Sequence, residues 1–331
     1  MINDAAKLHR KVLDADVEKA HTRDGFGKGL VEAAEKDERV VVLCADLAES
    51  TRAEWLKKKF PDRYIELGVA EQNLAATGSG FAAAGKVPFV ASYAAFNPGR
   101  NYEQIRTTIA LNEVPVKICG MHAGVSVGPD GATHQMLEDL GLMRMLPNTV
   151  VLYPADAEEA RKATYAAAFN DQPTYLRFAR EKTPVMTTPD TPFEIGKAYY
   201  LWKSERPQVA IIGAGPLLHE ALLAAQALEK EHIHVSVVNS HTIKPLDQGT
   251  ILAAVLEAGA VVTAEEHQKA GGLGSAVAEL LAQHFPVPHE FVAVDDQFGQ
   301  SGDPGELLKH YALDKEAIVQ KVKKVLGRKG S

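Results

Sequence analysis

One acidic side chain opens a segment that otherwise consists of small and weakly polar residues. Glu71 lies in GVAEQNLAATGSGFAAAG, residues 68–85. A solvated helix would carry more charge, and a buried carboxylate without a partner costs several kcal/mol. We expect Glu71 to begin a helix, where the helix dipole favours its charge. The alanines and glycines that follow would allow close packing against a neighbouring element, which we expect to include another subunit.

Further polar and aromatic side chains follow the apolar runs of the chain. Open α/β sheets bind ligands at the carboxyl ends of their strands, so these residues are candidates for one site. Each also has a structural explanation, as a turn residue, a helix cap or half of an ion pair. The residues are Asp46, Ser50, Phe96, Arg100, His122 and Arg180, with Arg23 just before the first long helix.

The loop GVSVGPDGATHQ at residues 124–135 is harder to explain structurally. Three glycines, Gly124, Gly128 and Gly131, permit unusual backbone angles and a close approach to a ligand. Asp130 and His134 add an acid and an imidazole to the same long loop, where functional residues are common. We therefore regard Asp130 and His134 as candidate site residues.

Short apolar runs alternate with amphipathic helical patterns, which is typical of parallel sheets covered by helices. The expected strands are 39–44, 63–67, 87–92, 115–121, 149–153, 208–213, 233–238, 259–264 and 290–294. The expected helices are 24–36, 51–59, 71–84, 100–112, 135–145, 156–169, 217–230, 247–257, 273–285 and 314–326. The proline-rich segment 182–207 interrupts this alternation, and we interpret it as an edge hairpin and linker. The sequence predicts an α/β fold with domains at 1–190 and 207–331, joined by a linker at 191–206.

The second domain contains GAGPLL at residues 213–218, directly after an expected strand. This string resembles the start of a dinucleotide-binding fingerprint, but Leu218 stands where the third glycine should be. A tight turn from strand to helix is the preferred interpretation.

Composition narrows the class of protein. The chain has 331 residues, of which 46% are hydrophobic, and a net charge of −7. It has no basic run long enough to follow a nucleic acid and no run of about 18 apolar residues. We therefore expect neither nucleic acid nor a membrane as a partner. The charged N-terminal segment lacks a signal-peptide core, and Cys44 and Cys119 fit reduced core thiols of a cytoplasmic protein.

A series of motifs in this order resembles the transketolase family of thiamine diphosphate enzymes. The motifs are TRDGFGKGL, CADLAES, ELGVAEQNLAATGSGFAAAGKVPFVASYAAF, MHAGVSVGPDGATHQMLEDL, LRFAR, NSHTIKPLD and EEHQKAGGLGSAVAELL. The resemblance covers about residues 20 to 325. It implies a pyrimidine-binding domain followed by the family's carboxyl-terminal domain, which has a mostly parallel sheet.

The resemblance implies roles for the candidate residues. Glu71 is the glutamate that hydrogen-bonds the ring nitrogen of the cofactor's aminopyrimidine, so the partner of this carboxylate is a ligand. Phe96 matches the aromatic residue that stacks on the pyrimidine. The other cofactor contacts implied are Tyr102, Leu47 and Asp46. Midway between the two aromatic positions, typical transketolases have another aromatic residue where this chain has Gly99.

The resemblance also implies a substrate site. Asp130 and His134 match the pair that recognises substrate hydroxyls near the reacting carbon. The residues expected to hold a sugar phosphate are Arg23, Ser50, His122 and Arg180. Two arginines, a hydroxyl and an imidazole are suited to binding a phosphate. The residues expected to take part in catalysis are Glu71, His134, Asp130 and His122.

One family motif is missing. The cofactor's diphosphate and Mg²⁺ are held in the family by GDG followed by an asparagine, and the nearest string is GDP at residues 302–304. The chain therefore resembles the carboxyl-terminal subunit of a split transketolase, with metal ligands on an amino-terminal partner and an expected 2+2 heterotetramer. It would transfer a two-carbon ketol unit from xylulose 5-phosphate to ribose 5-phosphate in the pentose phosphate pathway.

Three other functions fit the sequence less well. The beta subunit of a 2-oxoacid decarboxylase or dehydrogenase has a similar arrangement, but it has no need of Arg23, Ser50, Asp130 and Arg180 together. A deoxyxylulose phosphate synthase shares the loop pattern GxDGxTHQ but usually forms one long chain. A non-catalytic scaffold would not need Glu71, Asp130 and His134.

Overall fold

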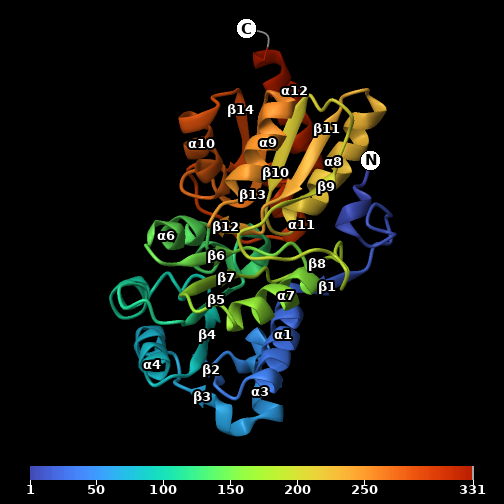
Figure 1. Ribbon diagram of the computed structural model, residues 1–331. Helices are drawn as coiled ribbons and strands as arrows, with labels where there is room; N and C mark the ends of the chain where they lie inside the picture. Colours follow the sequence, from blue (N-terminus) through green and yellow to red (C-terminus); the bar gives the residue numbers. More distant parts are fainter. Residues whose placement is uncertain (330–331) are drawn as a thin grey trace.

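The computed structural model describes residues 1–329 and contains two parallel-stranded sheets, one above the other (Figure 1). The lower sheet has seven strands in the order β12-β6-β7-β5-β4-β2-β3, and only β12 is antiparallel to its neighbour. Its strands are β2 (Val40–Cys44), β3 (Tyr64–Glu66), β4 (Val87–Tyr93), β5 (Lys117–Met121), β6 (Val150–Leu152), β7 (Thr174–Arg177) and β12 (Thr242–Lys244).

Helices cover both faces of the lower sheet because its strands are apolar on both sides. Every residue of β2 is buried: Val41 and Leu43 face one cluster of side chains, while Val40 and Val42 face another. The first cluster includes residues of α4 (Glu71–Ala83), α6 (Asp139–Met145) and a π-helical turn (Ile105–Ala110) that follows α5 (Tyr102–Gln104). The second includes residues of α1 (Thr22–Lys36), α3 (Ala53–Lys59) and α7 (Ala157–Ala168).

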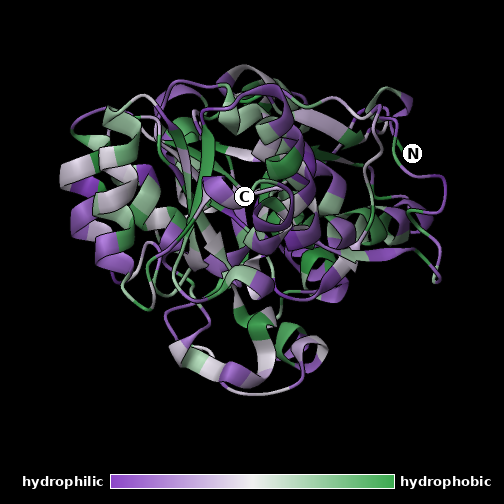
Figure 2. Ribbon diagram, turned by 90° about the horizontal axis from the view of Figure 1, so that it is seen from below, coloured by the Kyte–Doolittle hydropathy of each residue, from purple (hydrophilic) through white to green (hydrophobic). Residues whose placement is uncertain are grey.

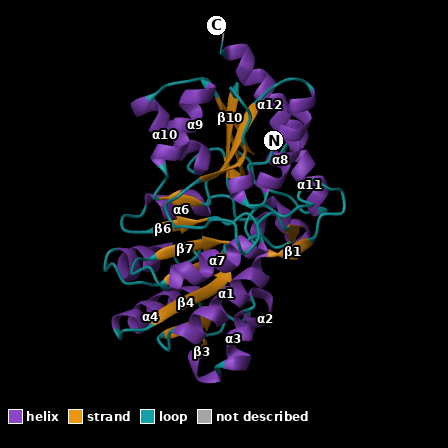
Figure 3. Ribbon diagram, turned by 45° about the vertical axis from the view of Figure 1, so that its right-hand side comes forward, coloured by secondary structure: helices purple, strands orange, loops and turns teal. Residues whose placement is uncertain are grey.

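The upper sheet has five strands in the order β14-β13-β10-β11-β9, and β9 is antiparallel to β11. Its strands are β9 (Tyr199–Trp202), β10 (Val209–Gly213), β11 (Val235–Asn239), β13 (Val261–Gln268) and β14 (His289–Val294). Its helices are α8 (Leu217–Lys230), α9 (Gln248–Ala258), α10 (Leu273–His284), α11 (Pro304–His310) and α12 (Lys315–Arg328). Figure 3 shows these helices on both sides of the strands, and Figure 2 shows apolar segments toward the interior with hydrophilic ones around them.

The α/β class and the order of the two domains are confirmed, but segment 182–207 was misread as a hairpin. Its two strands join different sheets: β8 (Lys182–Pro184) pairs with β1 (Lys19–His21), and β9 forms the edge of the upper sheet. The sequence reading also missed β7 as a strand. The remaining expected strands match observed ones closely, because most of them are short, apolar and buried. The GAGP turn is tight, with Gly215 at φ 70° against the ring of Tyr153.

The two domains exchange segments. β12 belongs to the second domain by its place in the sequence, but it pairs with β6 of the lower sheet. The residue that precedes β12, His241, is buried. In the opposite direction, the first residues of the chain pack on the upper sheet, where Ile2 bridges to Trp202. The domains are therefore joined at three places along the chain, which fixes the lower sheet relative to the upper one.

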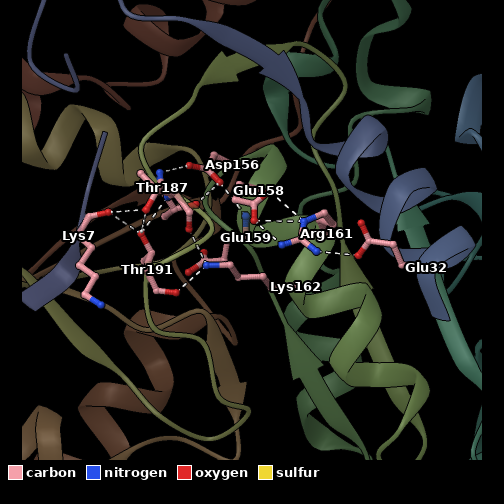
Figure 4. Close-up of polar contacts among 10 residues, drawn as sticks. Lys7, Glu32, Asp156, Glu158, Glu159, Arg161, Lys162, Thr187 and Thr191 are labelled. Carbon is pink, nitrogen blue, oxygen red and sulfur yellow. Dashed lines mark hydrogen bonds and ion pairs between the residues drawn. The ribbon is translucent and has the colours of Figure 1, made fainter. Parts of the chain in front are cut away.

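Helices α1 and α7 pack in direct contact, and this contact places the first turn of α1. A Cβ atom on Gly25 would lie 1.9 Å from the carbonyl oxygen of Ala157, and one on Gly29 would lie 2.4 Å from that of Arg161. Arg161 pairs with Glu32 of α1 across this contact (Figure 4).

The start of α7 is fixed separately. Asp156 accepts a hydrogen bond from the amide of Glu159 and further ones from the backbone and hydroxyl of Thr187 (Figure 4). This is an N-cap that also ties the helix to the segment after β8. Because α1 lies against this fixed helix, Arg23 in its first turn has a defined position.

Candidate functional site

The predicted residues converge at the carboxyl ends of β2, β4 and β5. Ser50 follows β2, Phe96 follows β4 and His122 follows β5. The side chains form a continuous series of contacts through Tyr93, the last residue of β4. This is where an open parallel sheet places ligands.

Glu71 begins α4, as predicted, and its side chain is only 1% exposed. Its Oε1 accepts a hydrogen bond from Ser92 at 3.1 Å, and its Oε2 pairs with Arg100 at 2.6 Å. The carbonyl oxygen of Glu71 accepts a hydrogen bond from buried Asn101 at 2.9 Å. The buried carboxylate therefore has a partner inside the chain, which the sequence analysis did not identify.

A second group surrounds His122. Arg23 donates to the carbonyl oxygen of Ser50 at 3.0 Å and lies 3.4 Å from Nε2 of His122. The hydroxyl of Ser50 is 2.8 Å from that of Tyr93, whose ring stacks on His122 at 4.3 Å. Nε of Arg23 and Nδ1 of His122 are buried and have no hydrogen-bond partner among the residues that the structure describes. Such groups are costly to leave unpaired, so they indicate a polar ligand.

His122 is neutral at physiological pH. Burial, together with the positive charges of Arg23 and Arg180, lowers the pKa of His122 to about 3. A neutral imidazole keeps one nitrogen as an acceptor and one as a donor. Burial and the neighbouring Arg52 lower the pKa of Arg23 as well, and an anion bound beside Arg23 would favour its charged form.

The glycine-rich loop supplies a third group. It forms 3₁₀ turns at Val125–Thr133, with Gly128 and Gly131 at positive φ. Arg180 donates to the carbonyl oxygen of Val127 and lies 3.6 Å from the carboxylate of Asp130.

His134 ends the loop with its ring edge toward two aromatic residues. Its ring is 5.4 Å from that of Phe96 and 6.2 Å from that of Tyr93. Nδ1 of His134 lies 2.9 Å from the hydroxyl of Thr133. These contacts place His134 beside the expected cofactor stacking residue.

Three predicted cofactor residues make their contacts elsewhere. The hydroxyl of Tyr102 donates to the carbonyl oxygen of Leu142 at 3.0 Å, and its ring packs on the core. Asp46 has a positive φ of 58° after β2, and its amide donates to Glu66. Leu47 is half-buried and packs on the cluster beneath α1. Their roles toward a cofactor stay predictions.

The sequence analysis did not single out Tyr93, which connects the groups around His122 and Phe96. A signal was present, because Tyr93 stands three residues before Phe96 at the end of an apolar strand. Among the described residues, no cluster of three or more His, Cys, Asp or Glu side chains could hold a metal ion. Nor does any helix of the described chain have the length and apolarity to cross a membrane.

Comparison with known protein families shows to which family the chain belongs. The model of the transketolase pyrimidine-binding domain matches residues 18–186, and that of the transketolase C-terminal domain matches residues 196–318. The chain belongs to the transketolase family. The family resemblance and the two-domain fold inferred from the sequence are thus confirmed.

Relatives of two lengths match this transketolase-family chain. It is 39% identical over 91% of its length to a transketolase C-terminal section of Methanocaldococcus jannaschii, covering 94% of that protein. It is 36% identical over 96% of its length to a 6-deoxy-6-sulfo-D-fructose transketolase subunit of a Clostridium species, covering 98% of it. The transketolase of Rattus norvegicus is 40% identical, but the chain spans only 49% of it.

A solved structure of similar chain length also matches. The chain is 42% identical to a split gene transketolase described as an inactive beta4 tetramer, with a TM-score of 0.87. The match covers 93% of this chain and 99% of that one.

Proposed function

We propose that this chain is the carboxyl-terminal subunit of a transketolase that transfers a two-carbon ketol unit between sugar phosphates with thiamine diphosphate. The observation that carries the proposal is one continuous site with two chemically different ends. Buried Glu71 and half-buried Phe96 lie at one end, and the cationic group around His122 lies at the other. A reaction on an anionic sugar held beside a heterocyclic cofactor needs both ends.

The residues present fit the aminopyrimidine of the cofactor. A carboxylate has about four acceptor positions, and Arg100 and Ser92 use two of those on Glu71. Glu71 would hydrogen-bond the pyrimidine ring nitrogen, and Phe96 would offer its ring face. When bound, the cofactor supplies a nucleophilic thiazolium carbon. The chain's own contribution is to orient the pyrimidine and to hold a shared proton at Glu71.

The other end fits a sugar phosphate. Arg23 contacts Ser50 and His122, and the charge of Arg180 acts on the same imidazole. Within residues 1–329, one buried nitrogen of Arg23 and one of His122 lack a partner. Asp130 would accept a hydrogen bond from a substrate hydroxyl, and His134 would donate one to a substrate hydroxyl. We propose xylulose 5-phosphate as donor and ribose 5-phosphate as acceptor. A sulfo-sugar is a second candidate, because one relative acts on 6-deoxy-6-sulfo-D-fructose and a cationic clamp also binds sulfonate.

We infer a separate amino-terminal partner that carries the GDG motif and the Mg²⁺ ligands. Support comes from relatives of this length described as a section or subunit, and from full transketolases about twice as long. The proposed assembly is two copies of each chain, acting in the cytoplasm in the pentose phosphate pathway. The 2-oxoacid alternative would leave Arg23, Arg180 and Asp130 without a substrate group to bind.

The proposal is tested by calorimetric titration with thiamine diphosphate and Mg²⁺, using the chain alone and then mixed with its amino-terminal partner. We expect tight binding only in the mixture, followed by ketol transfer from xylulose 5-phosphate. Tight, Mg²⁺-dependent binding to the chain alone would contradict the shared site. Binding in the mixture without ketol transfer would contradict the substrate assignment.

Arg180→Ala should raise the KM for xylulose 5-phosphate roughly 10- to 100-fold, because it removes a charge-assisted contact with the phosphate. Steady-state kinetics on xylulose 5-phosphate and on erythrulose, a ketose without phosphate, would measure the difference. Lys182→Ala, which alters an exposed cation two residues away, is the matched control. An equal loss with erythrulose would show that Arg180 does not recognise the phosphate.

A further inference from the structure

The segment Asn97–Asn101 between β4 and α5 is fixed by two fully buried asparagines. The side chain of Asn97 donates to the carbonyl oxygens of Val90 and Cys119, at 3.0 and 3.1 Å, and so attaches the segment to two strands. The side chain of Asn101 donates to the carbonyl oxygen of Glu71 at 2.9 Å and to Asn97 at 3.0 Å. The segment is thus bound both to the sheet and to the first turn of α4.

Gly99 allows the tight turn of this segment. A Cβ atom on Gly99 would lie 2.1 Å from the carbonyl oxygen of Ala95, a distance that no side chain tolerates. An aromatic residue therefore cannot occupy this position with the present backbone. The turn instead presents the next residue, Arg100, to the site.

Arg100 contacts both of the residues expected to bind the pyrimidine. Its Nη1 is 2.6 Å from Oε2 of Glu71, and its guanidinium carbon lies 4.5 Å from the ring centroid of Phe96. Within residues 1–329 this is the only ion pair of Glu71. Arginine suits the position because its planar guanidinium can stack on a ring and donate hydrogen bonds in the same plane.

We propose that Arg100 is a positioning residue that aims the Glu71 carboxylate at the pyrimidine ring nitrogen. This rests on the proposed function, since it assumes the cofactor. Arg100 and Ser92 restrain the two oxygens of Glu71 and leave acceptor positions free for the ligand. The buried asparagines hold Arg100 in register with Glu71.

The test compares two cofactors on the assembled enzyme. Calorimetry measures the Kd of thiamine diphosphate and of its analogue with carbon in place of the pyrimidine N1′ nitrogen. Arg100→Ala should weaken binding of thiamine diphosphate about tenfold, the loss expected for one charge-assisted contact. It should change binding of the analogue by less than about twofold, because the analogue cannot bond Glu71.

Three variants complete the experiment. Arg100→Lys should restore part of the affinity, because it keeps the charge but not the flat stacking group. Glu71→Ala combined with Arg100→Ala should bind thiamine diphosphate no worse than Glu71→Ala alone. Arg106→Ala, at an exposed position nearby, should leave both constants unchanged.

Two results would overturn the inference. Equal weakening of both ligands would show that Arg100 only supports the pocket. Tighter binding of thiamine diphosphate to Arg100→Ala would show that Arg100 competes with the cofactor for Glu71. Failure of the unaltered assembly to bind thiamine diphosphate would instead refute the proposed function, and this inference with it.

Discussion

Glu71→Ala should lower ketol transfer by roughly 100- to 1000-fold in the assembled enzyme, the range expected for loss of a group that handles a proton in the reaction. The carboxylate is almost fully buried, and its contacts with Ser92 and Arg100 hold it in one position. Removing it takes away the proposed bond to the pyrimidine nitrogen. Steady-state kinetics at saturating cofactor would measure the fall in kcat.

Matched variants separate this effect from damage to the fold. Glu71→Gln keeps the shape and one acceptor oxygen but not the charge, so its kcat should also fall substantially. Gln72→Ala changes the exposed neighbour on the same helix and should leave kcat unchanged. Thermal unfolding and gel filtration would verify that each variant folds and assembles. Unchanged ketol transfer by Glu71→Ala would exclude the catalytic role.

The position of Glu71 at the start of α4 could be predicted from the sequence because the relevant signals are local. A charge before a run of small residues indicates a helix start, and short apolar runs indicate buried strands. The candidates at strand ends converge for the same reason: the carboxyl ends of parallel strands share one edge. The order of elements was therefore enough to bring Ser50, Phe96 and His122 together.

Two kinds of feature could not be predicted in this way. β12 joins the lower sheet from far along the chain, and its three residues carry no local sign of which sheet they will enter. The ion pair of Glu71 with Arg100 depends on the conformation of Asn97–Asn101, which is fixed by side-chain bonds to distant backbone atoms. Long-range hydrogen bonds of this kind leave no periodic signal in the sequence.

Arg177 and Asp139 form an ion pair with no exposure to solvent, and they lie where the two domains meet. Nε of Arg177 is 2.7 Å from Oδ2 of Asp139, which also accepts a hydrogen bond from Tyr175 at 2.7 Å. Arg177 also donates to the carbonyl oxygen of Glu266 in the upper sheet at 2.9 Å. Burial opposes the charge of Arg177, but Asp139 together with Tyr153 and Tyr175 outweighs burial, so the pKa of Arg177 is raised.

Arg177→Ala should destabilise the protein by about 3–5 kcal/mol, because it leaves the charge of Asp139 buried with the hydroxyl of Tyr175 but without its cation. The midpoint of urea unfolding, followed by circular dichroism, would show the change. Arg144→Ala removes a partly exposed ion pair with Glu279 between α6 and α10, and it should cost less than about 1 kcal/mol.

A double variant shows whether Arg177→Ala loses stability because the charge of Asp139 is left buried or because hydrogen bonds are lost. Arg177→Met with Asp139→Leu removes both charges and fills similar volume, so it should recover much of the stability lost by Arg177→Ala. If the double variant is as unstable as Arg177→Ala, the hydrogen bonds to Tyr175 and Glu266 account for the lost stability instead of the ion pair. If Arg177→Ala unfolds like the unaltered chain, the pair contributes nothing, and β12 with the packed N-terminal segment must hold the lower sheet in place.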